Sequence, residues 1–101
     1  MRPMAATIPT LREAIDVIDH QIVELIAKRL DLVRQVGEIK KAEGRPVYDP
    51  VRERDLLAKV ARAAPQPLHP EAAQRIFERI IEESRSYEQR HISTPPGPNH
   101  P

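Results

Sequence analysis

Cysteine and tryptophan are both absent from this chain of 101 residues. Without thiols the chain can form no disulfide, no thiolate metal site and no cysteine nucleophile. Its aromatic residues are one phenylalanine and two tyrosines, which are too few for a surface that stacks nucleic-acid bases. The four histidines have no metal-ligand spacing, and there is no glycine-rich phosphate loop. We therefore expect neither a metal nor a cofactor.

A large net charge is also lacking, because 16 basic residues face 15 acidic ones and leave a formal charge of +1. This balance argues against a dedicated nucleic-acid or membrane-surface binder, which normally carries a basic excess. No apolar run approaches the roughly 20 residues that span a bilayer. Residues 1–9 lack the basic and then apolar pattern of a signal peptide. These absences favour a small cytoplasmic domain with a flexible N-terminus over residues 1–9.

Eleven prolines divide the chain into three proline-free windows, at residues 10–45, 51–64 and 71–94. Because proline is nearly excluded from helix interiors, these windows bound three candidate helices and predict an all-α fold. The folded domain is expected over residues 10–91. From Ile92 the chain reads ISTPPGPNHP, which predicts a disordered tail over residues 92–101 that buries no apolar surface.

The first window predicts one long helix over residues 11–43. Thr10 and Glu13 have the spacing of a capping box, and Gly44 is a suitable C-terminal stop. Apolar residues recur at alternating spacings of four and three along one face, interrupted once by Arg29. This repeat consists of Leu11, Ile15, Ile18, Ile22, Leu25, Arg29, Leu32, Val36 and Ile39.

Two shorter helices are predicted after it. Asp49 is a good N-cap and Pro50 suits the first helical position, so the second helix is expected from there to about Ala63. The third helix is expected to run from near Pro70 to about Gln89 or His91. Its inner face would carry Ala73, Ile76, Phe77, Ile80, Ile81, Ser84, Tyr87 and Glu88.

The length of the first helix implies a partner. At about 1.5 Å per residue, 33 residues extend roughly 50 Å, whereas a compact domain of this size has a radius of gyration of about 13 Å. The apolar repeat runs along the whole helix, so the projecting part needs a second apolar surface. The most economical solution is an intertwined homodimer in which the long helices pack together. A dimer of antiparallel helical hairpins would also provide this second apolar surface.

Charged residues interrupt the apolar faces in a pattern of their own. Arg29 is costly at a core position unless it is paired, and Lys40 returns to nearly the same face after three turns. Acidic residues of a neighbouring helix could pair with both cations, or both could extend to solvent. Two cations on the same apolar face, however, favour a binding site for a ligand. Arg52 and Glu53 open the second helix, where an N-terminal charged turn is ordinary.

Ser84 and Glu88 lie one turn apart on the third helix and continue its apolar line. They could mark a surface-facing helix end, or they could line a pocket in which burial would favour the neutral acid at Glu88. Cations with hydroxyl and carboxyl groups but no nucleophile indicate a site for a small dicarboxylate. Such a site works by positioning and electrostatics rather than by covalent chemistry.

The chain resembles the all-helical chorismate mutase family over roughly residues 8–91. The motifs that carry the resemblance are LREAIDVID, AKRLDLVRQVGEIKK, GRPVYDPVRERDLL and IFERIIEESRSYEQ, in this order. The resemblance implies a homodimer with two shared sites and the Claisen rearrangement of chorismate to prephenate, on the branch to phenylalanine and tyrosine. No cofactor is required.

The resemblance implies a role for each site residue. Arg29 would grip one substrate carboxylate, Arg12 of the other subunit the second, and Ser84 would add a carboxylate contact. Lys40 would hydrogen-bond the ether oxygen, beside Glu88. Arg29, Lys40 and Glu88 are thus the expected catalytic residues.

The remaining implied contacts surround the ring of the substrate. Arg52 would add positive potential near the ring carboxylate. Glu53 and the backbone of Asp49 would hold the ring hydroxyl, and Val36 and Ile81 would supply apolar walls.

Two positions depart from the pattern of the family. Glu88 stands where many members have glutamine, and only its protonated form could donate to the ether oxygen. Arg85 is more polar than the residue often found there. The alternatives are an isochorismate-pyruvate lyase, a mutase of amino-substituted chorismate, and a non-catalytic helical module; the last would leave Arg29 and Lys40 unexplained.

Overall fold

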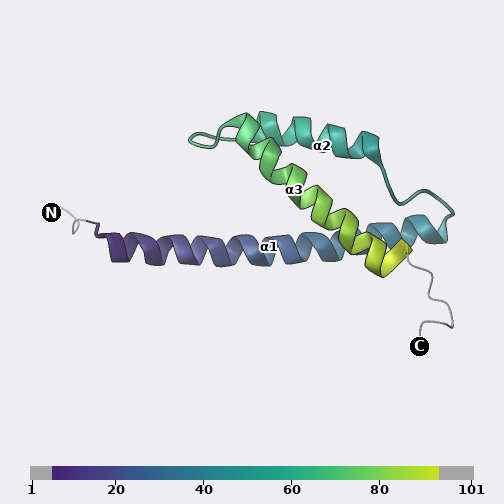
Figure 1. The fold of residues 1–101 in the computed structure, drawn as a ribbon, viewed down its shortest axis with the longest axis horizontal. Coiled ribbons are helices and arrows are strands. Elements are labelled where there is room, and N and C mark those ends of the chain that lie inside the picture. The colour runs from purple at the N-terminus through teal and green to yellow at the C-terminus, as the bar shows by residue number, and fades with distance from the viewer. Residues whose placement is uncertain (1–5, 94–101) are drawn as a thin grey trace.

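The computed structural model describes residues 6–93. The chain forms three α-helices, α1 (Ile8–Ala42), α2 (Pro50–Ala63) and α3 (Pro70–Glu88), followed by a π-helical turn, η1 (Gln89–Ser93). Figure 1 shows α1 as a long rod, with α2 and α3 as a hairpin over its C-terminal half. No strand occurs in the described part of the chain. The predicted all-α fold of three helices is confirmed.

The N-terminus of α1 differs from the prediction. Thr7, not Thr10, is the N-cap: its hydroxyl accepts a hydrogen bond from the Thr10 N–H at 3.2 Å. The Thr10 hydroxyl accepts one from the Thr7 N–H at 3.0 Å, which completes a reciprocal capping box. The capping box predicted from Thr10 to Glu13 is therefore wrong.

Helix α1 also extends into the segment expected to be a flexible N-terminus. Ile8 and Pro9 are helical. Pro9 fits because the first helical turn leaves N–H groups unpaired in any case, so a residue without an N–H costs nothing there. Of the rest of the expected flexible segment, Ala6 and Thr7 are described and are not helical, and residues 1–5 lie outside the described residues.

The other helix ends follow the sequence signals closely. Helix α1 ends at Ala42, and Gly44 adopts a φ of +72°, the left-handed region in which a side chain would be strained. The Asp49 carboxylate accepts a hydrogen bond from the Arg52 N–H at 3.0 Å and caps α2. Pro50 and Pro70 occupy the first turns of α2 and α3.

The core of the chain is small and lies where α3 and η1 meet the other helices. Its buried apolar residues are Ala73, Ile81 and Ile92, all at most 5% exposed. Burial of Ile92 contradicts the expectation that residues 92–101 bury no apolar surface, because η1 continues the helical path of α3 by one more turn. Residues 94–101 lie outside the described residues.

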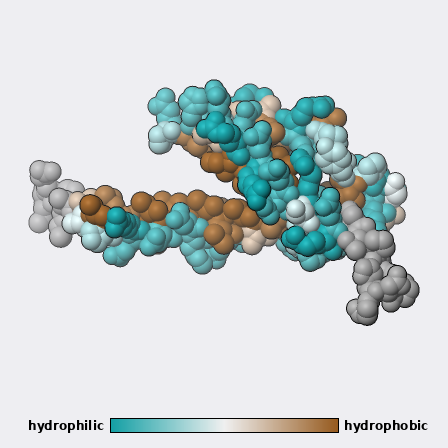
Figure 2. Space-filling model, in the orientation of Figure 1, coloured by the Kyte–Doolittle hydropathy of each residue, from teal (hydrophilic) through white to brown (hydrophobic). Residues whose placement is uncertain are grey.

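The apolar repeat of α1 stays uncovered. Leu11, Ile15, Ile18 and Leu25 are each at least 52% exposed, and Figure 2 shows apolar side chains along the projecting rod. The radius of gyration is 18.7 Å, and the longest extent of the molecule is 66 Å. The predicted mismatch between helix length and domain size is therefore present in the chain. None of the described helices is both long and apolar enough to cross a membrane.

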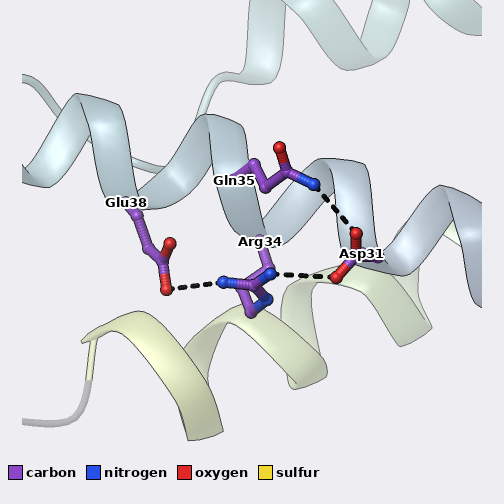
Figure 3. A network of polar contacts seen from close by, with 4 residues as sticks. All are labelled: Asp31, Arg34, Gln35 and Glu38. Carbon is purple, nitrogen blue, oxygen red and sulfur yellow. Dashed lines mark hydrogen bonds and ion pairs between the residues drawn. The ribbon is translucent and has the colours of Figure 1, made fainter.

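The polar face of α1 neutralises its own charges. Figure 3 shows Arg34 between Asp31 and Glu38, with N···O distances of 2.9 and 2.8 Å, and Gln35 also donates to Asp31. The bonds from Arg34 and Gln35 hold the pKa of Asp31 below its usual range, and the two carboxylates raise the pKa of Arg34. Arg34 is thus a paired arginine in the same helix as Arg29.

Candidate active site

A cavity of about 290 Å³ lies where α1, α2 and α3 approach one another. It contains nine of the ten predicted site residues, contributed by all three helices and the turn before α2. These nine are Arg29, Val36, Lys40, Asp49, Arg52, Glu53, Ile81, Ser84 and Glu88. Residues 55 positions apart in the chain, Arg29 and Ser84, thus meet in one pocket.

Arg12 is the predicted site residue that does not line this cavity. It precedes Arg29 by 17 residues in the same helix. At about 1.5 Å per residue, this places it roughly 25 Å away along the helix axis. Arg12 therefore cannot reach the pocket of its own chain, and its predicted role requires a second chain.

Four apolar wall residues were not predicted as site residues: Leu32, Val33, Val47 and Leu56. Leu32 and Leu56 lie on faces whose apolar spacing the sequence does show. Val47 is a single apolar residue between two prolines, and no periodic pattern indicates such a position. Together they give the cavity a mixed lining, as small-molecule sites require.

Arg29 is held by a hydroxyl group rather than by an acid. Its Nη1 donates to Ser84 Oγ at 2.8 Å, and Ser84, which is 6% exposed, donates in turn to the Ile80 carbonyl. Burial lowers the pKa of Arg29, and the neighbouring Arg52 lowers it further. Among residues 6–93 neither arginine forms an ion pair. The cavity therefore holds a partly desolvated cation whose charge an anionic ligand would neutralise.

Lys40 differs from Arg29 in having an acidic partner. Its Nζ lies 3.4 Å from Asp49 Oδ2, and its side chain is only 15% exposed. The bond from the Arg52 N–H, together with Lys40, holds the pKa of Asp49 below its usual range. The explanation in which neighbouring acids neutralise the cations of the apolar face thus applies to Lys40 but not to Arg29.

Glu88 lies in the cavity beside these cations. Burial raises the pKa of its carboxyl group, and the nearby Glu53 acts in the same direction. Lys40 and Arg29 lower it, but burial is the largest influence. Burial thus shifts the equilibrium at Glu88 towards the neutral acid, the form that can donate a hydrogen bond.

Arg85 closes one side of the cavity in place of an apolar wall. It donates to both carboxylate oxygens of Glu53, at 2.9 and 3.1 Å, and its guanidinium lies 5.6 Å from the centre of the Tyr48 ring. The bonds to Glu53 raise the pKa of Arg85. This pair joins α2 to α3 across the pocket and holds Glu53 in place.

The balance of charge in the cavity favours an anionic ligand. Two of its three carboxylates, Asp49 and Glu53, are paired with cations, and burial raises the pKa of the third, Glu88. Within residues 6–93, Arg29 and Arg52 remain without acidic partners. In the described part of the chain no group of acidic or histidine side chains could hold a metal ion. The arrangement can bind and orient a small dicarboxylate.

Comparison with known proteins identifies the family of the chain. The family model for chorismate mutase type II matches residues 11–89. The T-protein of Enterobacter agglomerans is 40% identical over 88 residues, which is 84% of this chain but 23% of the T-protein. A chorismate mutase of Methanocaldococcus jannaschii is 29% identical over 88% of this chain and 91% of its own length.

A solved structure of a similar chain gives the same result for the fold. The chorismate mutase of Thermus thermophilus superposes with a TM-score of 0.79 at 32% identity, covering 82% of this chain and 94% of that one. The chain therefore belongs to the chorismate mutase type II family. It spans less than a quarter of the T-protein, so only that part is comparable.

The unpaired state of Arg29 predicts that the site reduces stability. We expect Arg29→Met to raise the urea midpoint of unfolding, because it removes a desolvated cation that no acid neutralises. Arg34→Met is the matched control and should lower the midpoint, since it breaks two ion pairs. An equal decrease of the urea midpoint in both variants would show that Arg29 stabilises the fold as Arg34 does.

Proposed function

We propose that the protein catalyses the rearrangement of chorismate to prephenate. Its membership of the chorismate mutase type II family supports this proposal. The observation that carries it is the meeting in one cavity of Arg29, Lys40 and Glu88, whose pKa burial raises. These groups suit a dicarboxylate whose ether bond breaks within a single molecule.

The reaction is unimolecular, so the site accelerates it by fixing a conformation and by stabilising charge. Carboxylate clamps hold the flexible enolpyruvyl arm over the ring, which removes the entropy of finding the reactive conformer. Arg29, held by Ser84, supplies one clamp from within the cavity. Arg12 of a second chain supplies the other.

The groups around the ether oxygen must stabilise the charge that develops on it in the transition state. Breaking the C–O bond ahead of C–C bond formation places negative charge on that oxygen. A fixed Lys40 ammonium and a protonated Glu88 stabilise this charge more in the transition state than in the ground state. An ionised Glu88 would repel it.

The other lining residues place the ring. Arg52 adds positive potential near the ring carboxylate. Glu53 accepts from the ring hydroxyl, and because Arg85 holds both of its oxygens, the carboxylate keeps one orientation. The Asp49 backbone assists it, while Val36 and Ile81 pack against the apolar parts of the ring.

The proposed functional unit is a homodimer with two shared sites. The exposed apolar repeat of α1 supports it, because a second copy of α1 offers a matching surface. The distance of Arg12 from its own pocket supports it independently. A cytoplasmic location is part of the same proposal.

Product identification tests the proposed reaction. We expect the protein to convert chorismate to prephenate, and Arg29→Met to lower kcat/KM by about 100-fold or more while the protein stays folded. Release of pyruvate from isochorismate would instead indicate the lyase, and preference for amino-substituted chorismate the related mutase. No turnover of any of these would favour a non-catalytic helical module.

The Glu88 carboxyl group predicts a characteristic pH dependence. Burial raises its pKa, so kcat/KM should fall as the pH rises through a value above the ordinary range of a glutamate. Glu88→Gln should remove this decline, because an amide donates at every pH. A rate that is independent of pH from weakly acidic to alkaline conditions in the unmodified protein would contradict the role of Glu88.

Mixed dimers test whether Arg12 acts on the opposite chain. Arg12→Ala and Arg29→Met proteins should each be nearly inactive, but unfolding them together and refolding the mixture should restore about a quarter of the activity. Half of the dimers are then mixed, and each mixed dimer has one intact site of two.

The matched control for the mixed dimers combines two residues of the same pocket. Arg29→Met refolded with Lys40→Met should restore nothing, because every site then lacks one of them. Restoration in this control would contradict the placement of Arg29 and Lys40 in one site, and no restoration with Arg12→Ala would place Arg12 outside the shared site.

A further inference from the structure

The turn η1 packs against α1 at Gly37, which is the only buried residue of α1. A Cβ atom on Gly37 would overlap the Ile92 side chain and lie 3.4 Å from Glu88 Oε2. Ile92 itself is 2% exposed. The absent side chain of Gly37 therefore provides the space that Ile92 occupies, and the Glu88 carboxyl group lies beside the same space.

A second contact fixes the backbone of the turn. Lys41 Nζ donates to the Ile92 carbonyl at 2.8 Å. This charge-assisted bond joins α1 to η1 over a separation of 51 residues. Side-chain packing at Gly37 and the bond from Lys41 together hold η1 against α1, one turn of helix beyond Glu88.

Glu88 and Ile92 are four residues apart, so they lie on the same side of the continuing helical path. Atoms of both lie within 4 Å of the same point over Gly37. The aliphatic side chain of Ile92 therefore stands next to the carboxyl group, where η1 packs against α1. It occupies volume that water would otherwise fill.

We propose that Ile92 is a positioning residue for Glu88: by filling the space over Gly37 it excludes water from the carboxyl group and keeps that group facing the cavity. Its effect on catalysis rests on the proposed function of the site. Its effect on Glu88 itself does not, and can be measured without substrate.

The charged groups around Glu88 allow this effect to be isolated. Lys40 and Arg29 face it from α1 and Glu53 from α2, while Arg85 lies on its own helix. Substitution of Ile92 alters none of these groups. A change in the titration of Glu88 in such a variant therefore reports the access of water, which is the largest influence on its pKa.

The direct test is carboxyl ¹³C NMR titration of Glu88 in the full-length chain. We expect Ile92→Ala to lower the pKa of Glu88 towards its ordinary value, and Ile92→Val to lower it less. Leu68→Ala is the matched control, since it removes a partly exposed apolar side chain from the α2–α3 connection and should leave the titration unchanged.

Gly37→Ala reaches the same contact from the other helix. The added methyl group displaces Ile92, so this variant should also lower the pKa of Glu88. In a chain that already carries Ile92→Ala, the same substitution should have little further effect, because the overlapping side chain is gone. Independent, additive shifts would mean that the two residues do not act through one contact.

Kinetics separates this proposal from the proposed reaction. If chorismate is the substrate, the decline of kcat/KM should move to lower pH in Ile92→Ala by the same shift as the NMR titration, and should be absent when Glu88→Gln is added. A shifted titration without turnover in any variant would retain the role of Ile92 and reject the reaction. An unchanged Glu88 titration in folded Ile92→Ala or Ile92→Val, or in Gly37→Ala, would overturn the proposal.

Discussion

The half-buried guanidinium of Arg29 is the constraint on which the site depends. It interrupts the apolar repeat of α1, and a hydroxyl group, not an acid, meets it on α3. Ser84 can do this only because α3 crosses α1 at this height, so the position of the α2–α3 hairpin and the charge of the cavity are linked. Arg34, five residues away, shows the contrasting arrangement, with its charge neutralised within its own helix.

Pairing is distributed unevenly over the rest of the cavity. Asp49 caps α2 and also faces Lys40, while Arg85 occupies Glu53. Asp49 and Glu53 are therefore each paired with a cation other than Arg29. Neither carboxylate forms an ion pair with Arg29. The positive potential of the pocket arises from which charges are paired, and the overall charge of +1 gives no indication of it.

Features that depend on local sequence could be predicted, and features that depend on tertiary distance could not. Most helix limits followed from prolines and caps, but the α1 start did not: Thr10 was predicted as the cap, and Thr7 is the cap. The placement of Arg29 and Lys40 on one face followed from helical periodicity, whereas a site role for Arg52 was implied only by the family resemblance. The pairing of Arg85 with Glu53 spans 32 residues, and the burial of Ile92 depends on Gly37 of another helix. No periodic pattern shows either of these contacts.

The projecting half of α1 has an energetic consequence. Every residue from 6 to 25 is exposed in the single chain, so no packing within the chain stabilises this stretch. An isolated helix of that length is marginal in water. In the proposed homodimer, the surface that covers its apolar side would supply its helical stability as well, so that ordering of this segment and association would be a single equilibrium whose position depends on protein concentration.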